Sequence, residues 1–119
     1  MKKTASEHYR QRRGNCAQSV VFAWNTANPG RPANAELFSA YGGGRAPDGL
    51  CGALYASCAI AETSVAETIK KSFSEKSGGH VKCREIRKAK TLTCAGCVEL
   101  AAELLEKHSR NATTDTAPS

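Results

Sequence analysis

The chain is poor in aromatic residues and contains no long apolar run. It has three Phe, three Tyr and one Trp, too few to suggest the aromatic platform on which single-stranded nucleic acids stack their bases. Because no apolar run approaches the roughly 18 residues of a transmembrane helix, we expect no membrane span. Residues 1–14, MKKTASEHYRQRRG, lack the apolar core of a secretory signal peptide, so we expect a cytoplasmic protein.

The cysteine content is too low for a disulfide scaffold but high enough to call for a functional explanation. Six cysteines in 119 residues fall below the density of small secreted disulfide-rich proteins. In a cytoplasmic protein, cysteines are more often catalytic or metal-binding than bridged. The sequence has no CxxCH motif, so we expect no covalent haem. A functional thiol site is therefore the leading hypothesis.

The charge balance is basic. The formal net charge is +6 and the sequence pI is about 9.1. Such a surface suits an acidic protein partner, although a solvated charged face is the simplest interpretation. Nucleic acid is not expected as a partner, since the stacking residues are scarce.

The hydrophobic pattern predicts an all-α protein. We expect a single compact bundle of about five helices around a buried central helix at 50–62, LCGALYASCAIAE, which is apolar on nearly every side. Residues 1–108 form the predicted domain, and 109–119, SRNATTDTAPS, the predicted flexible tail, because that segment lacks core-forming residues. Four further bundle helices are predicted at 2–13, 16–27, 64–78 and from about residue 94, with short helices at 35–41 and 83–90. The predicted core comprises Val20, Trp24, Leu37, Phe38, Leu54, Ile60, Ile69, Phe73, Ile86, Val98, Leu104 and Leu105.

Four cysteines stand where helices are predicted to begin. Asn15 and Thr93, both good capping residues, directly precede two of them, and the turn at 42–49 precedes a third. The partial positive charge of a helix N-terminus lowers a thiol pKa and favours the thiolate. We therefore expect these four thiols to converge on one redox or metal-thiolate site. They are Cys16, Cys51, Cys83 and Cys94.

The motif CAGC at 94–97 places two cysteines on one face of a predicted helix start. Cys94 can act as a nucleophile and Cys97 as a resolving thiol, but zinc sites, iron–sulfur sites and pairs of inert buried cysteines share this spacing. Cys58 lies in the middle of a predicted helix, so we expect a core residue with a high pKa. His80, near Cys83, is the one histidine considered as a ligand; His8 and His108 are expected at the surface.

The order of these motifs resembles the C_GCAxxG_C_C family of redox-active proteins. The matching segments are NCAQSV at 15–20, GGGRAPDGLCGAL at 42–54, CREI at 83–86 and CAGCVELAAELL at 94–105. The resemblance spans residues 5–106 and implies a small helical protein with electron-transfer associations. A similar domain is joined to a haem module in split-Soret-type cytochromes, for which an iron–sulfur centre has been considered. The family's four cysteines would correspond to Cys16, Cys51, Cys83 and Cys94.

These observations together predict a redox-active or electron-transfer protein. The expected ligands of an iron–sulfur cluster are Cys16, Cys51, Cys83 and Cys94. One alternative is a structural zinc protein that binds a partner through its basic face. Another is metal-free thiol–disulfide exchange through Cys94 and Cys97. If the protein is a redox or electron-transfer protein, its partner would be another redox protein, and an acidic partner would suit the basic surface.

Overall fold

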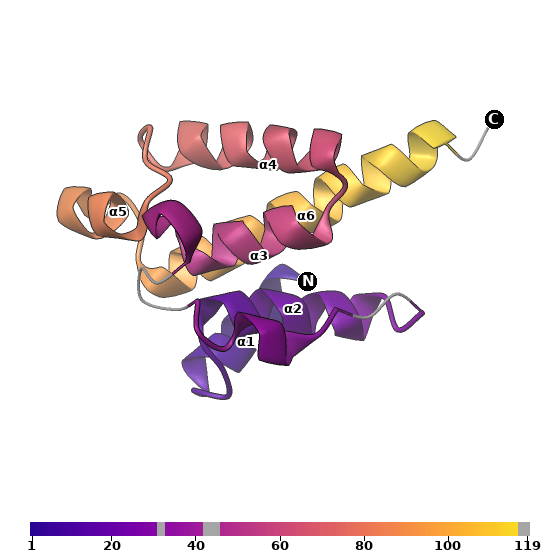
Figure 1. Cartoon of the computed structure of the whole chain (residues 1–119), viewed down its shortest axis with the longest axis horizontal. Helices are drawn as coiled ribbons and strands as arrows, with labels where there is room; N and C mark the ends of the chain where they lie inside the picture. The colour runs from indigo at the N-terminus through magenta and orange to yellow at the C-terminus, as the bar shows by residue number, and fades with distance from the viewer. Residues whose placement is uncertain (31–32, 42–45, 117–119) are drawn as a thin grey trace.

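A computed structural model describes residues 1–30, 33–41 and 46–116 (Figure 1). Within these residues the chain is helical and has no strand, which confirms the all-α class. The Cα radius of gyration is 13.2 Å, the size expected of a compact domain of this length. The elements are α1 (Lys2–Arg10), α2 (Cys16–Ala27), η1 (Ala35–Phe38), η2 (Pro47–Gly49), α3 (Gly52–Ile60), α4 (Thr63–Lys76), α5 (Cys83–Ala89) and α6 (Cys94–Thr116).

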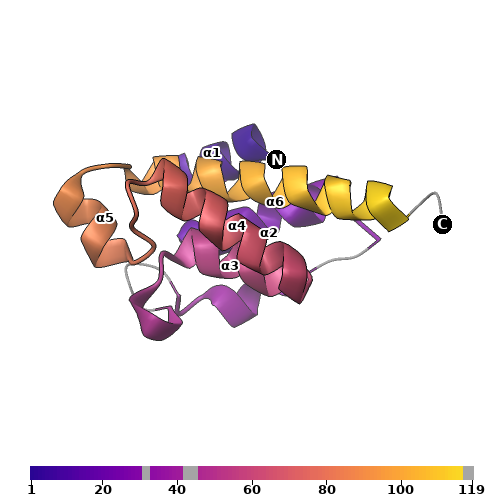
Figure 2. The same cartoon turned by 90° about the horizontal axis from the view of Figure 1, so that it is seen from above.

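Helix α6 runs along most of the molecule and packs against α1, α2, α3 and α4 (Figure 2). Helix α3, which covers most of the predicted central segment 50–62, packs against α2, α4 and α6. The structure thus has six α-helices among the described residues, where about five were predicted, and the central position of 50–62 is not confirmed.

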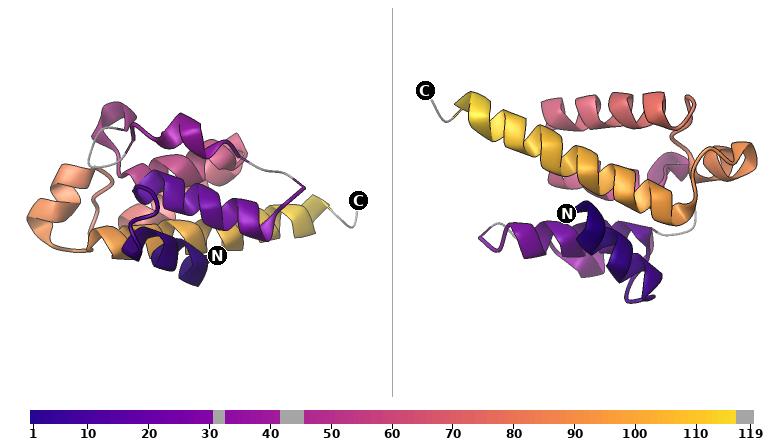
Figure 3. Two further views of the ribbon diagram at one scale, coloured as in Figure 1. Left: turned by 90° about the horizontal axis from the view of Figure 1, so that it is seen from below. Right: turned by 180° about the vertical axis from the view of Figure 1, so that it is seen from behind.

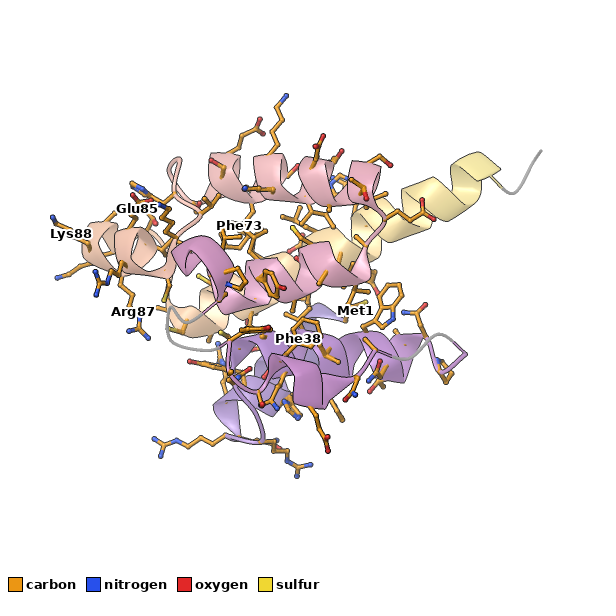
Figure 4. All side chains as sticks on the ribbon, in the orientation of Figure 1. Met1, Phe38, Phe73, Glu85, Arg87 and Lys88 are labelled. Atoms are coloured by element: carbon orange, nitrogen blue, oxygen red, sulfur yellow. The ribbon has the colours of Figure 1, made fainter. Side chains whose placement is uncertain are left out.

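Most of the predicted core is buried. Phe73 and Ile69 from α4 and Leu54 from α3 are fully buried, and Figure 4 shows Phe73 directed from α4 toward α3. Trp24 and Ile60 are only partly buried and pack against the edge of the core, while the side chain of Leu37 lies outside the described residues. The other predicted members Val20, Phe38, Ile86, Val98, Leu104 and Leu105 are buried.

Two helix ends differ from the prediction. Helix α1 stops at Arg10 rather than at residue 13, since Arg12 adopts a left-handed conformation with φ of 58° and ends the helical path before Gly14. Helix α6 continues past residue 108 to Thr116, so the loss of apolar residues there does not end the helix. The division into a domain of 1–108 and a tail of 109–119 stays a prediction.

Different helices form the two ends of the long axis of the molecule. Figure 3 shows α5, in orange, at one end of the long axis and the C-terminal part of α6, in yellow, at the other. None of the helices in the described ranges has the length and apolar character needed to cross a membrane. Four of the six α-helices begin at, or one residue after, a cysteine, and the glycine-rich segment 42–45 lies outside the described residues.

Asn15 is the predicted cap of α2 and has a second role. Its side chain accepts a hydrogen bond from the Gln18 N–H at 2.7 Å, and the Gln18 amide accepts one from the Asn15 N–H at 3.1 Å, which completes a capping box. The Asn15 amide also donates to the carbonyl oxygens of Phe38 and Ser39, each at 3.0 Å. One side chain therefore fixes both the start of α2 and the segment after η1.

We expect Asn15→Ala to lower the free energy of unfolding by about 2 kcal/mol, the upper end of the cost of losing a cap, because two carbonyl partners are lost as well. Chemical denaturation followed by circular dichroism measures the change. Asn34→Ala is the matched control, since the Asn34 side chain caps η1 by accepting a hydrogen bond from the Glu36 N–H at 3.0 Å. Equal losses in the two variants would contradict this double role.

Candidate functional site: a cysteine-lined pocket

A short backbone pairing brings the starts of α3 and α5 together. Leu50 and Lys82 form an isolated antiparallel bridge, and the Cys51 N–H donates to the Val81 carbonyl oxygen at 2.9 Å. Cys51 is the N-cap of α3, and Cys83 is the first residue of α5. Two cysteines that are 32 residues apart in sequence (83 − 51 = 32) are therefore held at adjacent helix ends.

The start of α2 joins this assembly through a close backbone approach at Gly52. A Cβ atom built on Gly52 would lie 2.2 Å from the Tyr41 carbonyl oxygen and 2.7 Å from the Cys16 Sγ atom. No residue other than glycine fits this space without a shift of its neighbours. The missing side chain is what lets the sulfur of Cys16 reach the first turn of α3.

The start of α6 supplies the last two cysteines. Thr93 caps this helix, with its Oγ1 atom accepting a hydrogen bond from the Gly96 N–H at 2.9 Å. Cys97 is buried, with 5% of its surface exposed, whereas Cys94 is partly exposed. Cys94 thus lies nearer to solvent, and Cys97 lies behind it.

These helix starts surround one pocket with a cavity volume of about 340 Å³. The four predicted ligands Cys16, Cys51, Cys83 and Cys94 all line it, and so does Cys97. The five thiols come from α2, α5, α6 and the cap of α3. Eight other residues complete the lining: Tyr9, Asn15, Ser39, Ala40, Gly52, Ile86, Arg87 and Leu92.

The predicted lowering of thiol pKa values is wrong for Cys51. A hydrogen bond with the Cys97 thiol, burial and the charge of Cys97 raise the pKa of Cys51 well above its ordinary value. The N–H groups of Leu54 and Ala53, in the first turn of α3, act in the opposite direction but are outweighed. A helix N-terminus alone cannot hold a thiolate beside a second thiol in a buried site.

The same correction applies to Cys83. Burial raises the pKa of Cys83, and the charges of Cys51 and Cys94 raise it further, although Arg87 lowers it. The sequence shows the helix start but not the neighbouring thiols, which tertiary packing supplies. Mutual repulsion among thiolates therefore opposes ionisation of this group in the metal-free protein.

Two residues at the pocket were missed by the sequence prediction. Arg87 donates a hydrogen bond from Nη2 to Cys94 Sγ at 3.5 Å. Its position one helical turn after Cys83 is a signal that could have identified it. Burial and a hydrogen bond with Cys94 raise the pKa of Tyr9 to about 12. No local pattern marks Tyr9, because it reaches the pocket only through the packing of α1 on α6.

Cys58 and the histidines lie outside the pocket lining. Burial raises the pKa of Cys58, as expected, and its sulfur lies 3.6 Å from the Ala66 carbonyl oxygen. His8, expected at the surface, is instead partly buried, stacked on Phe22 and hydrogen-bonded to Ser19 at 3.1 Å. His80 is also partly buried and does not line the cysteine pocket. Burial lowers the pKa of His108.

All six cysteines belong to the described residues, and none of them is in a disulfide. Across residues 1–30, 33–41 and 46–116, no group of three or more His, Cys, Asp or Glu side chains is arranged to hold a metal ion. The thiols thus share one pocket in the reduced state without forming a ready coordination sphere. The ligand and nucleophile roles predicted for them stay predictions.

We expect Tyr9 to ionise with a pKa of about 12 rather than the ordinary value of about 10. Subtracting the phenolate absorbance titration of Tyr9→Phe from that of the native protein isolates this group. Because the folded protein holds the phenol proton more tightly than the unfolded chain, Tyr9 lowers stability as the pH rises from about 10 to about 12. A difference titration with a midpoint near 10 would contradict both the burial of Tyr9 and its hydrogen bond with Cys94.

Comparisons with known proteins do not identify the chain: no family model, no curated protein and no solved structure matches it.

Proposed function

We propose that this protein is a redox-active or electron-transfer protein whose site is the cysteine-lined pocket. The observation that carries the proposal is the meeting of Cys16, Cys51, Cys83, Cys94 and Cys97 around one cavity. Thiols are the side chains that form disulfides and ligate iron–sulfur clusters. The resemblance to the C_GCAxxG_C_C family supports the same class, and we propose a cytoplasmic location and an acidic redox protein as partner.

An iron–sulfur cluster suits the donor chemistry of these thiols, but binding would require them to move, because in the described residues no three of them are arranged to hold a metal. Cys16, Cys51, Cys83 and Cys94 would hold it, and the bound cluster would supply a one-electron carrier. The Ala53 and Leu54 N–H groups already interact with the Cys51 sulfur, and such hydrogen bonds tune the potential of a cluster. The positive charge of the metal would also offset the raised pKa values of Cys51 and Cys83, since ligation releases the thiol protons.

Metal-free thiol–disulfide exchange is the second candidate, favoured by the partly exposed Cys94 in front of the buried Cys97. The Cys94 thiolate would attack a disulfide of the partner, forming a mixed disulfide and releasing one partner thiolate. Cys97 would then attack Cys94 Sγ, forming the Cys94–Cys97 disulfide and releasing the second partner thiol. The protein dithiol is oxidised, and the partner disulfide is reduced to two thiols.

Visible absorbance and metal analysis of anaerobically purified protein separate these candidates. An iron–sulfur cluster gives a coloured protein containing iron and sulfide, zinc gives a colourless protein containing metal, and exchange chemistry gives a colourless protein without metal. In the last case, a small disulfide should oxidise two thiols per chain. Protein that contains no metal and whose thiols resist a disulfide would overturn the proposed function.

A further inference from the structure

Helix α5 carries the densest positive charge beside the pocket. The segment 82–90, KCREIRKAK, has five basic residues and one acidic residue, Glu85. All five basic side chains are exposed, and Figure 4 shows Lys88 pointing away from the body of the molecule. We call this set the α5 basic surface: Lys82, Arg84, Arg87, Lys88 and Lys90.

No ion pair to this surface is found among the side chains that the structure describes. The ion pairs found there join the N-terminus, Lys2 and Arg10 to Glu106, Glu103 and Glu99 of α6, at 3.4, 3.5 and 3.6 Å. None of them involves the α5 basic surface. The basic residues of α1 are thus partly used to hold the fold together, whereas Lys82, Arg84, Lys88 and Lys90 of the α5 basic surface are in none of these ion pairs.

The α5 basic surface is attached directly to the pocket. Cys83, Ile86 and Arg87 line the cavity, and Ile86 is the residue through which α5 is buried in the core. Arg87 contacts the Cys94 sulfur at 3.5 Å. A molecule bound over α5 would therefore lie at the edge of the thiol site, as transfer of an electron or a disulfide requires.

We propose that the α5 basic surface is the docking site of an acidic protein segment, which brings a redox partner to the pocket; the redox character of that partner rests on the proposed function. Complementary charge speeds the encounter and orients the two proteins. Short-lived redox encounters use small interfaces, which a helix of seven residues can provide. The segment 82–90 has no aromatic residue on which nucleic acid bases could stack.

The test measures binding of a fluorescently labelled oligo-glutamate peptide by anisotropy at low salt. Arg84→Glu with Lys88→Glu reverses two charges on α5 without replacing a pocket residue. Lys70→Glu with Lys71→Glu makes the same charge change on exposed residues of α4. We expect the α5 variant to bind about tenfold more weakly and the α4 variant to change by less than about twofold, since only α5 would contact the peptide. Circular dichroism checks that both variants fold.

A second measurement ties the docking site to the pocket. Bound peptide should slow alkylation of Cys94 but leave Cys58 unaffected. Equal weakening in the two variants, or no binding at low salt, would overturn the proposal. Tighter binding of a single-stranded oligonucleotide with the same dependence on α5 would assign the surface to nucleic acid instead. Peptide binding requires no metal and no redox activity. The docking proposal can therefore hold when the proposed function fails, and it can fail when the proposed function holds.

Discussion

Serine substitution of any one of Cys16, Cys51, Cys83 or Cys94 is expected to abolish metal content or redox activity, whereas Cys58→Ser should leave both nearly intact. A hydroxyl ligates soft metals poorly and cannot form a disulfide. Losing one ligand also weakens the others, because metal binding and closure of the site are coupled. Cys58→Ser is the matched control, since Cys58 does not line the pocket and packs against Ala66 instead.

Cys97→Ser separates the two candidate mechanisms. If the four predicted cysteines hold a cluster, the Cys97 variant should keep most of its iron and sulfide. If the protein exchanges disulfides through Cys94 and Cys97, the variant should stop at the mixed disulfide and fail to release the second partner thiol. Metal analysis and mass spectrometry measure these outcomes. Loss of bound metal in the Cys58→Ser variant would show that the ligand roles are wrongly assigned to the four pocket cysteines. Alkylation that is fastest at Cys58 would show the same.

Gly52→Ala is expected to disrupt both the fold and the site. The added methyl would lie 2.2 Å from the Tyr41 carbonyl oxygen and 2.7 Å from Cys16 Sγ, far inside van der Waals contact. The nearer neighbour is backbone, so relief requires α2, α3 or the segment around Tyr41 to move. Overpacking of this kind costs about 1–3 kcal/mol of stability, and more where backbone must shift. Denaturant unfolding measures the loss.

Gly30→Ala is the matched control for this substitution. A Cβ atom on Gly30 meets no atom of the described residues within 4 Å, so the same chemical change should alter the unfolding midpoint very little. Gly52→Ala should also lose any bound metal along with stability, because the substitution displaces the Cys16 sulfur. Unfolding midpoints that agree for Gly52→Ala and the native protein would show that α2 and α3 do not approach each other this closely.

The sequence was sufficient to predict the local features of the site, such as where its helices begin. Asn15 and Thr93 mark helix starts because a cap depends on a few neighbouring residues, and both cap as expected. Helical periodicity places Cys58 in the middle of a helix, and it indeed lies outside the pocket. The all-α class follows from the same local signals.

Tertiary packing decided the rest. Cys97, predicted from the sequence as the resolving thiol for Cys94, also forms a hydrogen bond with Cys51 and helps to raise the pKa of that residue. Tyr9 and Arg87 reach Cys94 from α1 and α5. The spacing of residues in the sequence does not predict how close these two helices lie to α6. A helix start fixes the sign of the local field, but a thiol pKa also depends on burial and on charges brought from elsewhere. The sequence therefore determined which cysteines begin helices, and only the fold determined which sulfurs face one another.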